Sequence, residues 1–467
     1  MNQTTAKPSS SAIGALIQSL PEHLHNRFSL NQEIRNQHGH GEDRFGTVAP
    51  DAVFYASTTE QVALLLKACN QLSIPIIPYG AGTSCEGQLI AVQGGLSLDL
   101  TEMNAVIEID PDDMTCRVQA GVNRKQLNHE LRHLGVFFPV DPGADASIGG
   151  MAATRASGTN AVRYGTMREN VMGLTVVTAQ GETITTGGKA KKSAAGYDLT
   201  RLFVGSEGTL GVMTEIQLKL HPIPEVIKSA VCSFETVEDA VNSVILAVQC
   251  GIPVARIELL NRLQMDACIG YSKLQGFESK PTLFLEFHGS DAYVKEQIDA
   301  LQQITQDQGG SDYRWAETTE ARNELWQARH HAYFASQAIK PGFASIATDV
   351  CVPISKLADN LLAAERKAEE LELCCPIVGH VGDGNYHMLI LFDSKDPEQA
   401  DRASQLSGYL VANALSSGGT CTGEHGIGFG KKGYLVQEHG AAVELMKTLK
   451  KALDPNLIMN PQKVLDF

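Results

Sequence analysis

The sequence predicts an α+β protein in which two domains follow an N-terminal tail. Strand-like runs alternate with helical patterns from about Asp51 onward, and the alternation resumes beyond a break at Pro222 and Pro224. The chain has 467 residues, and a domain usually contains about 100–200, so two or three domains are expected. We therefore expect a tail with a short helix over residues 1–45, a first domain over 46–224 and a second domain over 225–467.

In the first domain, short apolar runs bounded by turn residues indicate strands. Thr58 and Gln61 have the spacing of a capping box, which predicts a helix through about Asn70. Asn123 can cap a second helix that ends at Gly135, because glycine readily adopts the left-handed conformation at a helix end. The expected strands are Val53–Ala56, Ile74–Pro78, Leu96–Leu100, Val106–Ile109, Cys116–Ala120, Leu174–Ala179 and Met213–Leu220.

The second domain shows the same two kinds of pattern. Strands are expected at Thr282–Phe287, Ile377–His380 and His387–Leu391. A last helix is expected at about Ala441–Leu453, just before Asp454-Pro455.

Charge and cysteine content limit the functional classes. The formal net charge of −15 argues against nucleic-acid binding and gives no help to binding an anionic membrane. No apolar run approaches the roughly 20 residues of a membrane span, and Met1–Ser11 lacks the features of a secretory signal or of an arginine-containing presequence. The ten scattered cysteines indicate reduced thiols. We expect a cytoplasmic protein, with peripheral attachment at the inner face of the membrane left open.

Three segments of the first domain are rich in small residues. Pro78–Gly87 directly follows a predicted strand, Pro142–Gly165 is too long for a simple turn, and Gly205–Val212 has the same composition. Small residues let backbone N–H groups approach an anion, and the hydroxyls of Thr83 and Ser84 add donors. A tight surface turn is the alternative, but it needs only one or two glycines. Three such segments in one domain indicate a large, flat, phosphorylated cofactor.

A literal G-x-G-x-x-G occurs at Gly428, Gly430 and Gly433. No suitable strand leads into it, and no acidic residue follows at the usual distance, so we interpret it as coincidental.

The second domain contains histidines set among glycines. His380 and His387 flank a turn rich in glycine and aspartate, while Glu424 and His425 lie in a second glycine-rich segment. Two imidazoles and a carboxylate are a common ligand set for a catalytic divalent metal, which would leave His425 as a base. A histidine in a loop more often serves only as a hydrogen-bonding residue, and that alternative stays open here.

These segments resemble a known family. Those of the first domain are similar, over about Gly46–Pro224, to the FAD-binding domain of the vanillyl-alcohol-oxidase type, and those of the second to the FAD-linked D-2-hydroxyacid dehydrogenases. Thr348–Pro353 and Gly419–Gly426 are most similar to the members that act on D-lactate. The resemblance implies a two-subdomain FAD domain followed by an α+β cap. It also implies zinc or manganese at His380, His387 and Glu424, and His425 as the base.

The same resemblance implies which residues bind FAD. They are Pro78, Gly80, Ala81, Gly82, Thr83, Ser84, Gly87, Pro142, Gly143, Ala144, Ser147, Gly149, Gly150, Ala153, Ser157, Gly158, Glu207, Gly208, Gly211, Val212 and Asn460. No histidine occupies the position of a covalent flavin link, so FAD is expected to be noncovalent.

Trp326-Gln327-Ala328-Arg329 matches the family's W-x-x-R, whose arginine binds the substrate carboxylate. A surface ion pair is the alternative role for Arg329. The family's dicarboxylate enzymes have a lysine at the position of Ala347, so its replacement here favours a monocarboxylate.

The expected activity is oxidation of D-lactate, or of a similar small D-2-hydroxy acid, with hydride transfer to the flavin. The expected acceptor is cytochrome c, a quinone or an electron-transfer flavoprotein, and a homodimer is left open. The alternatives are a glycolate oxidase flavin subunit and a non-catalytic flavoprotein subunit of an electron-transfer complex.

Overall fold

The computed structural model describes residues 10–316 and 318–467, so the first nine residues of the expected tail lie outside the described part. The chain forms two compact units. Unit 1 contains the chain up to Ser157, Gly165–Ile223 and Glu424–Phe467, and unit 2 contains Gly158–Tyr164 and Pro224–Gly423. The sequence assigned everything after residue 224 to one domain, whereas the structure returns Glu424–Phe467 to unit 1. Strand and helix patterns show where an element lies, but not which sheet a segment rejoins.

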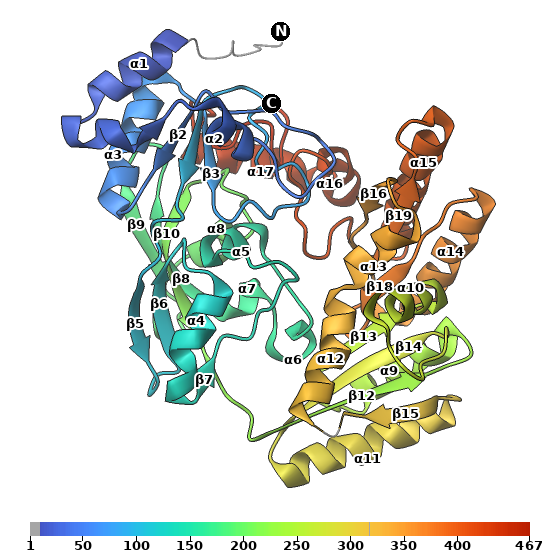
Figure 1. Cartoon of the computed structure of the whole chain (residues 1–467). Helices are drawn as coiled ribbons and strands as arrows, with labels where there is room; N and C mark the ends of the chain where they lie inside the picture. The colour runs from blue at the N-terminus through green and yellow to red at the C-terminus, as the bar shows by residue number, and fades with distance from the viewer. Residues whose placement is uncertain (1–9, 317) are drawn as a thin grey trace. The chain divides into compact units, whose positions relative to one another are not determined.

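Unit 1 contains a four-stranded sheet in the order β1-β2-β4-β3. Figure 1 labels β2 and β3 of this sheet. Its strands are β1 (Phe28–Ser29), β2 (Ala52–Tyr55), β3 (Ile76–Tyr79) and β4 (Leu96–Asp99), and β4 is parallel to both β2 and β3. Helix α3 (Thr59–Leu72) is capped by Thr58, whose hydroxyl accepts a hydrogen bond from the Gln61 backbone. The Gln61 side chain accepts from the Ser57 backbone, so only half of the expected capping box forms.

The second sheet of unit 1 has five antiparallel strands in the order β5-β6-β10-β8-β9. They are β5 (Val106–Asp110), β6 (Thr115–Gln119), β8 (Val171–Val177), β9 (Thr183–Gly187) and β10 (Val212–Lys219). Phe54 of the first sheet and Val118 and Ile216 of the second are fully buried in one hydrophobic core. Burying both sheets against one core holds their loops in fixed positions.

The remaining elements of unit 1 are short. Asn123 caps α4 as expected, and Gly135 ends the following 3-10 turn with a φ of 70°. Part of the long segment Pro142–Gly165 is helical. The other elements are α1 (Ser10–Ser19), η1 (Glu22–Arg27), α2 (Gln32–Gln37), α4 (Arg124–Leu131), η2 (Arg132–Leu134), β7 (Val136–Phe137), α5 (Ile148–Thr154), α7 (Met167–Asn170), α8 (Leu199–Phe203), β11 (His221–Pro222), α16 (Lys432–His439) and α17 (Ala442–Leu453).

Unit 2 is built on one antiparallel sheet in the order β15-β12-β14-β13-β18-β19-β16, with β17 paired to β19. Its strands are β12 (Val226–Ser233), β13 (Arg256–Leu260), β14 (Thr282–Gly289), β15 (Ser311–Trp315), β16 (Ala344–Ala347), β17 (Val350–Cys351), β18 (Ile377–His380) and β19 (Asn385–Phe392). Its helices are α6 (Ala161–Tyr164), α9 (Val237–Gln249), α10 (Arg262–Ser272), α11 (Asp291–Asp307), α12 (Thr319–His330), α13 (Ala332–Ile339), η3 (Ile354–Lys356), α14 (Leu357–Glu370) and α15 (Pro397–Ser416).

Alternation along the strands gives the sheet of unit 2 two different faces. Leu260 and Phe284 pack with Trp326 of α12 and with residues of α10 and α13 in one cluster. Glu258 lies two residues before Leu260 and therefore points to this same face. The face covered by α10, α12 and α13 thus receives a buried acidic residue as well as apolar ones.

No helix among the described residues is long and apolar enough to cross a membrane. No disulfide joins any two of the cysteines in the described part of the chain.

Candidate active site

The three small-residue segments come together within unit 1. A Cβ atom added to Gly80, just after β3, would lie 2.3 Å from the Ser147 hydroxyl, so the first and second segments touch. A Cβ added to Gly208 would lie 2.9 Å from Cγ of Pro78, so the third segment touches the first. The backbone N–H of Glu207 donates to Ala153 across 2.9 Å, which joins the third segment to the second.

The C-terminal segment closes this cluster. Asn460 donates from its side chain to the Glu207 carbonyl at 2.8 Å, and its backbone N–H donates to Ile76 of β3. The buried ammonium of Lys450 donates to the carbonyls of Thr209 and Met459, both at 2.7 Å. Asn460, distant in sequence from the glycine segments, therefore lies beside them.

Polar atoms of the cluster fit a bound polar cofactor. Ser84 Oγ, Ser206 Oγ and Asn460 Oδ1 are buried and have no hydrogen-bond partner among the residues that the structure describes. Buried polar atoms are nearly always hydrogen-bonded, so these atoms match a ligand that accepts and donates hydrogen bonds. Gly82 has a φ of 76°, a conformation that side-chain-bearing residues rarely adopt, and a Cβ at Gly143 would meet nothing within 4 Å.

Other expected cofactor residues have packing reasons for their identity. A Cβ at Gly149 would lie 2.6 Å from Cβ of Ala120, and one at Gly211 would lie 2.8 Å from Val176. Gly87 packs closely against Phe45 and Phe429. These three glycines allow loops to approach neighbouring elements, whether or not they also contact a ligand.

Glu207 orders the segment that carries Glu424 and His425. Its two carboxylate oxygens accept hydrogen bonds from the backbone N–H groups of Ile427 and Gly428, each at 2.8 Å. A Cβ at Gly426 would lie 2.9 Å from the Glu207 carboxyl carbon, which explains a glycine there. Burial raises the pKa of Glu207 despite these bonds. The sequence placed Glu207 among the cofactor-binding residues, which stays a prediction, and the structure shows its carboxylate in contact with protein backbone.

His425 is surrounded by carboxylates within unit 1. Its Nδ1 lies 3.9 Å from Glu86 Oε1 and its Nε2 lies 3.9 Å from Glu424 Oε1. The side chain of Gln88 donates to the His425 carbonyl at 2.9 Å and fixes the backbone. Glu86 also pairs with Lys431 at 3.0 Å, so a cation partly balances this acidic surrounding.

His380 and His387 lie together in unit 2, on adjacent strands β18 and β19. Their ring centroids are 5.4 Å apart with planes at 85°. His380 Nδ1 is 2.7 Å from Glu258 Oε1, and His387 Nδ1 is 3.0 Å from the Thr348 carbonyl. A carbonyl and a carboxylate can only accept, so in the neutral rings Nδ1 carries the proton and Nε2 carries the lone pair. This is the tautomer in which Nε2 can bind a metal.

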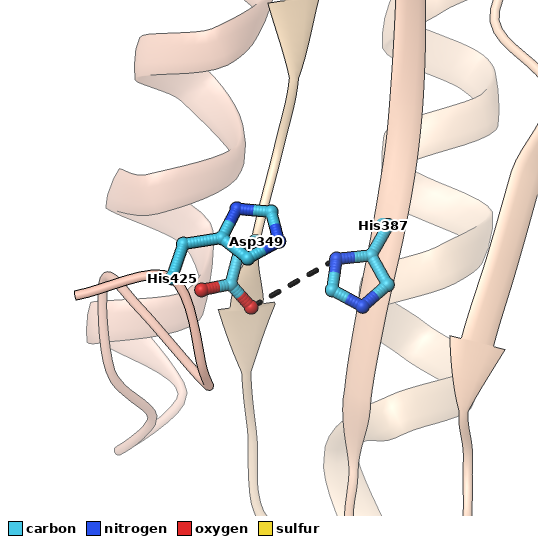
Figure 2. Close-up of side chains that lie close together, drawn as sticks. All are labelled: Asp349, His387 and His425. Atoms are coloured by element: carbon cyan, nitrogen blue, oxygen red, sulfur yellow. Dashed lines mark ion pairs between the residues drawn. The ribbon is translucent and has the colours of Figure 1, made fainter. Parts of the chain in front are cut away.

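The carboxylate of Asp349 lies beside the ring of His387. Figure 2 shows the two side chains, with Asp349 Oδ1 3.9 Å from His387 Nδ1. Asn385 donates to Asp349 Oδ1 at 2.8 Å, and Thr422 donates to Oδ2 at 2.7 Å. The segment just before Glu424 is therefore tied to the same place in unit 2 as His387.

Arg329 is buried on α12, 8% exposed, and is not a surface residue. Its Nε and Nη2 both donate to Glu258 Oε2, at 3.0 and 2.5 Å. Burial acts to raise the pKa of Glu258, but the charges and hydrogen bonds of His380 and Arg329 lower it by more than burial raises it. The pKa of Glu258 therefore lies below its usual value. Glu258 thus contacts two expected site residues, and sequence reasoning missed it. The only signal was one acidic residue in the otherwise apolar end of a strand, Arg-Ile-Glu-Leu-Leu.

Ala347, the expected determinant of substrate choice, ends β16 and is exposed. It pairs with Leu389 of β19, which lies on the same face as His387, two residues away. The position of Ala347 is therefore on the histidine-bearing face of the sheet.

Comparison with known proteins defines the class of the chain. A model described as "FAD linked oxidases, C-terminal domain" matches residues 223–464, and a model described as "FAD binding domain" matches residues 50–187. The chain belongs to the FAD-linked oxidases, a family of oxidoreductases. The expectation that FAD is the cofactor is confirmed by this membership.

Its relatives narrow the class further. A Danio rerio protein named "Probable D-lactate dehydrogenase, mitochondrial" is 48% identical over 94% of this chain and 89% of its own length. The Arabidopsis thaliana "D-lactate dehydrogenase (cytochrome), mitochondrial" is 45% identical over 96% and 80%. The Bacillus subtilis "Glycolate oxidase subunit GlcD" is 35% identical over 89% of both chains. The resemblance to the FAD-linked D-2-hydroxyacid dehydrogenases is confirmed.

Solved structures confirm the fold class. A p-cresol methylhydroxylase structure matches with a TM-score of 0.79 and 20% identity, covering 98% of this chain and 99% of the other. An alkyldihydroxyacetonephosphate synthase matches with a TM-score of 0.77 and 19% identity, covering 99% and 87%. At these identities the likeness shows the fold alone.

The expected cytoplasmic location is wrong. Four relatives at 38–48% identity are named mitochondrial, which points to mitochondria instead. Net charge and scattered cysteines are compatible with more than one reducing compartment, so they did not decide between them.

Proposed function

We propose that the chain oxidises D-lactate to the corresponding 2-keto acid, with FAD as the oxidant and a divalent metal, zinc or manganese, in the site. The observation that carries the choice of substrate is the identity of 48% and 45%, over nearly the whole chain, to proteins named D-lactate dehydrogenases. The three joined small-residue segments and Asn460 support FAD binding in unit 1. FAD, when bound, would supply the oxidising capacity for removal of a hydride from the substrate's α carbon.

Arg329 is proposed to bind the substrate carboxylate. Glu258 occupies Nε and one hydrogen of Nη2, which leaves the hydrogens of Nη1 and the second hydrogen of Nη2 for a carboxylate. A guanidinium that is already held in place loses little freedom when it binds its ligand. The pairing with Glu258 supports an anchor that orients the substrate.

His380, His387 and Glu424 are proposed as metal ligands. The fixed tautomers of the two histidines support this, because both rings offer Nε2 as the lone-pair nitrogen. Glu424 directly follows Gly423, whose Cβ position lies 3.0 Å from Asp349 beside His387. A divalent ion held there would lower the pKa of the substrate hydroxyl as a Lewis acid.

His425 is proposed to take the hydroxyl proton. Loss of this proton and of a hydride from the α carbon converts the 2-hydroxy acid to the 2-keto acid. Glu86 and Glu424 beside the ring would stabilise the imidazolium that forms. The relatives' names favour a cytochrome as the final acceptor, and a homodimer stays a prediction.

A substrate panel with an artificial electron acceptor tests the proposal. We expect the highest kcat/KM with D-lactate, and a His425→Gln variant that keeps FAD but loses about 10²–10⁴ in kcat. The glycolate oxidase relatives support a second candidate, a glycolate-oxidising flavin subunit. A kcat/KM for glycolate above that for D-lactate would favour this second candidate.

A further inference from the structure

Glu258 is a deeply buried carboxylate, with 1% of its surface exposed, and it contacts two of the proposed site residues, His380 and Arg329. It lies in the middle of β13, next to β18 in the sheet. The register pairs Leu259 with Gly379 and Leu260 with Val378, and its continuation places Glu258 opposite His380. Arg329 reaches the same carboxylate from α12.

The two oxygens of Glu258 have separate partners. Oε1 accepts from His380 Nδ1 at 2.7 Å, and Oε2 accepts from Nε and Nη2 of Arg329. The Glu258 carboxylate therefore links the side chains of His380 and Arg329. Loss of either partner would leave a buried charge only partly compensated, which is costly.

We propose that Glu258 is a positioning residue that holds both the Nε2 of His380 and the guanidinium of Arg329 in their working orientations. The inference rests on the proposed function, which gives His380 and Arg329 their roles. Accepting a hydrogen bond from Nδ1–H keeps that proton on Nδ1 and the lone pair of His380 on Nε2, where a metal ion binds. Engaging Nε and Nη2 turns the opposite end of the guanidinium toward an incoming carboxylate.

A purely structural ion pair is the competing explanation, and the chain contains a matched control for it. Glu286 lies on the adjacent strand β14, 4% exposed, two residues from Glu258's cross-strand partner Phe284 and on the same face. It also has an arginine and a histidine as partners, with Arg256 at 3.6 Å and His288 at 2.9 Å. In the described part of the chain, the hydrogen bonds and ion pairs of Glu286 join it to Ser229, His288 and Arg256.

The experiment compares Glu258→Gln with Glu286→Gln in the FAD-containing full chain. After chelator treatment, Zn²⁺ and Mn²⁺ are added back, and affinity is measured by competition with a chromophoric chelator. An amide at 258 cannot accept from both partners, because its nitrogen must face one of two donors. We expect metal affinity to fall about 10–100-fold in Glu258→Gln and to stay close to wild type in Glu286→Gln. The KM for D-lactate should also rise only in the first variant.

Each outcome decides the inference. Equal losses of metal affinity in the two variants, or unchanged affinity in Glu258→Gln, would overturn it while leaving the proposed function standing. A wild-type protein that binds neither metal would overturn the proposed metal site together with the inference. If Glu258→Gln fails to fold, Glu258→Asp keeps the charge but shortens the reach, and it should still weaken metal binding; wild-type affinity in that variant refutes the positioning role.

Discussion

Replacing Ala347 with lysine tests the proposed basis of substrate choice. The residue is exposed and lies on the same face as His387, so a longer side chain can be accommodated there without displacing the core. A dicarboxylate such as D-2-hydroxyglutarate would bring a second negative charge, for which the proposed anchor Arg329 offers no further site. We expect the wild type to prefer D-lactate by about 10²-fold in kcat/KM.

The exposure of position 347 limits how much kcat/KM for D-2-hydroxyglutarate a lysine there can recover. An ion pair at an exposed position contributes about 1 kcal/mol at most, so Ala347→Lys should raise kcat/KM for D-2-hydroxyglutarate about fivefold. Ala347→Met has a similar length without the charge and is the matched control. Steady-state kinetics of both acids with all three proteins give the ratio. The reasoning is refuted if the wild type uses both acids equally well, or if methionine and lysine have the same effect.

Four further predictions concern the cofactors and the acid stability of unit 2. Gly82→Asp should abolish flavin binding, because it adds a carboxylate and strains a backbone φ of 76°. Acid precipitation of the wild type should release the flavin into the supernatant. Flavin that stays in the pellet would refute a noncovalent link. His380→Ala should lose metal by elemental analysis while keeping FAD, and retention of both metal and turnover would exclude a ligand role. Burial acts to raise the pKa of Glu286, yet Arg256, His288 and Ser229 hold it at about 2, below its usual 4.5. A depressed pKa stabilises the fold above about pH 4.5 and loses that effect as the pH falls toward 2. Urea unfolding should therefore show Glu286→Gln losing about 3 kcal/mol at pH 7 and much less near pH 2, and a difference independent of pH would contradict this.

Local sequence signals predicted the elements better than the connections between them. Asn123 and Gly135 mark helix ends through their own side-chain and backbone properties, so they could be read directly. The helices α5 and α6 were missed because the glycine, alanine and serine of Pro142–Gly165 resemble a loop. Small residues there serve close packing as much as turning.

Contacts between distant residues could not be predicted. Glu258 is 71 residues from Arg329 and 122 from His380 in sequence. The pairing of β13 with β18 brings Glu258 beside His380, and helix α12 carries Arg329 to the same carboxylate. The apolar neighbours of Glu258 in the strand are a local signal of burial, but they do not indicate which residues the carboxylate contacts. The return of Glu424–Phe467 to unit 1 is another long-range feature, since it depends on partners such as Glu207 and Ile76.

Anaerobic reduction of the purified flavoprotein by D-lactate tests the central claim most directly. The oxidised flavin's visible absorbance is followed after mixing with D-lactate, L-lactate or glycolate in the absence of any acceptor. The account predicts rapid and complete bleaching by D-lactate, slow or no bleaching by L-lactate, and slower bleaching by glycolate. A protein that stays yellow with D-lactate, or is bleached equally fast by L-lactate, would contradict it.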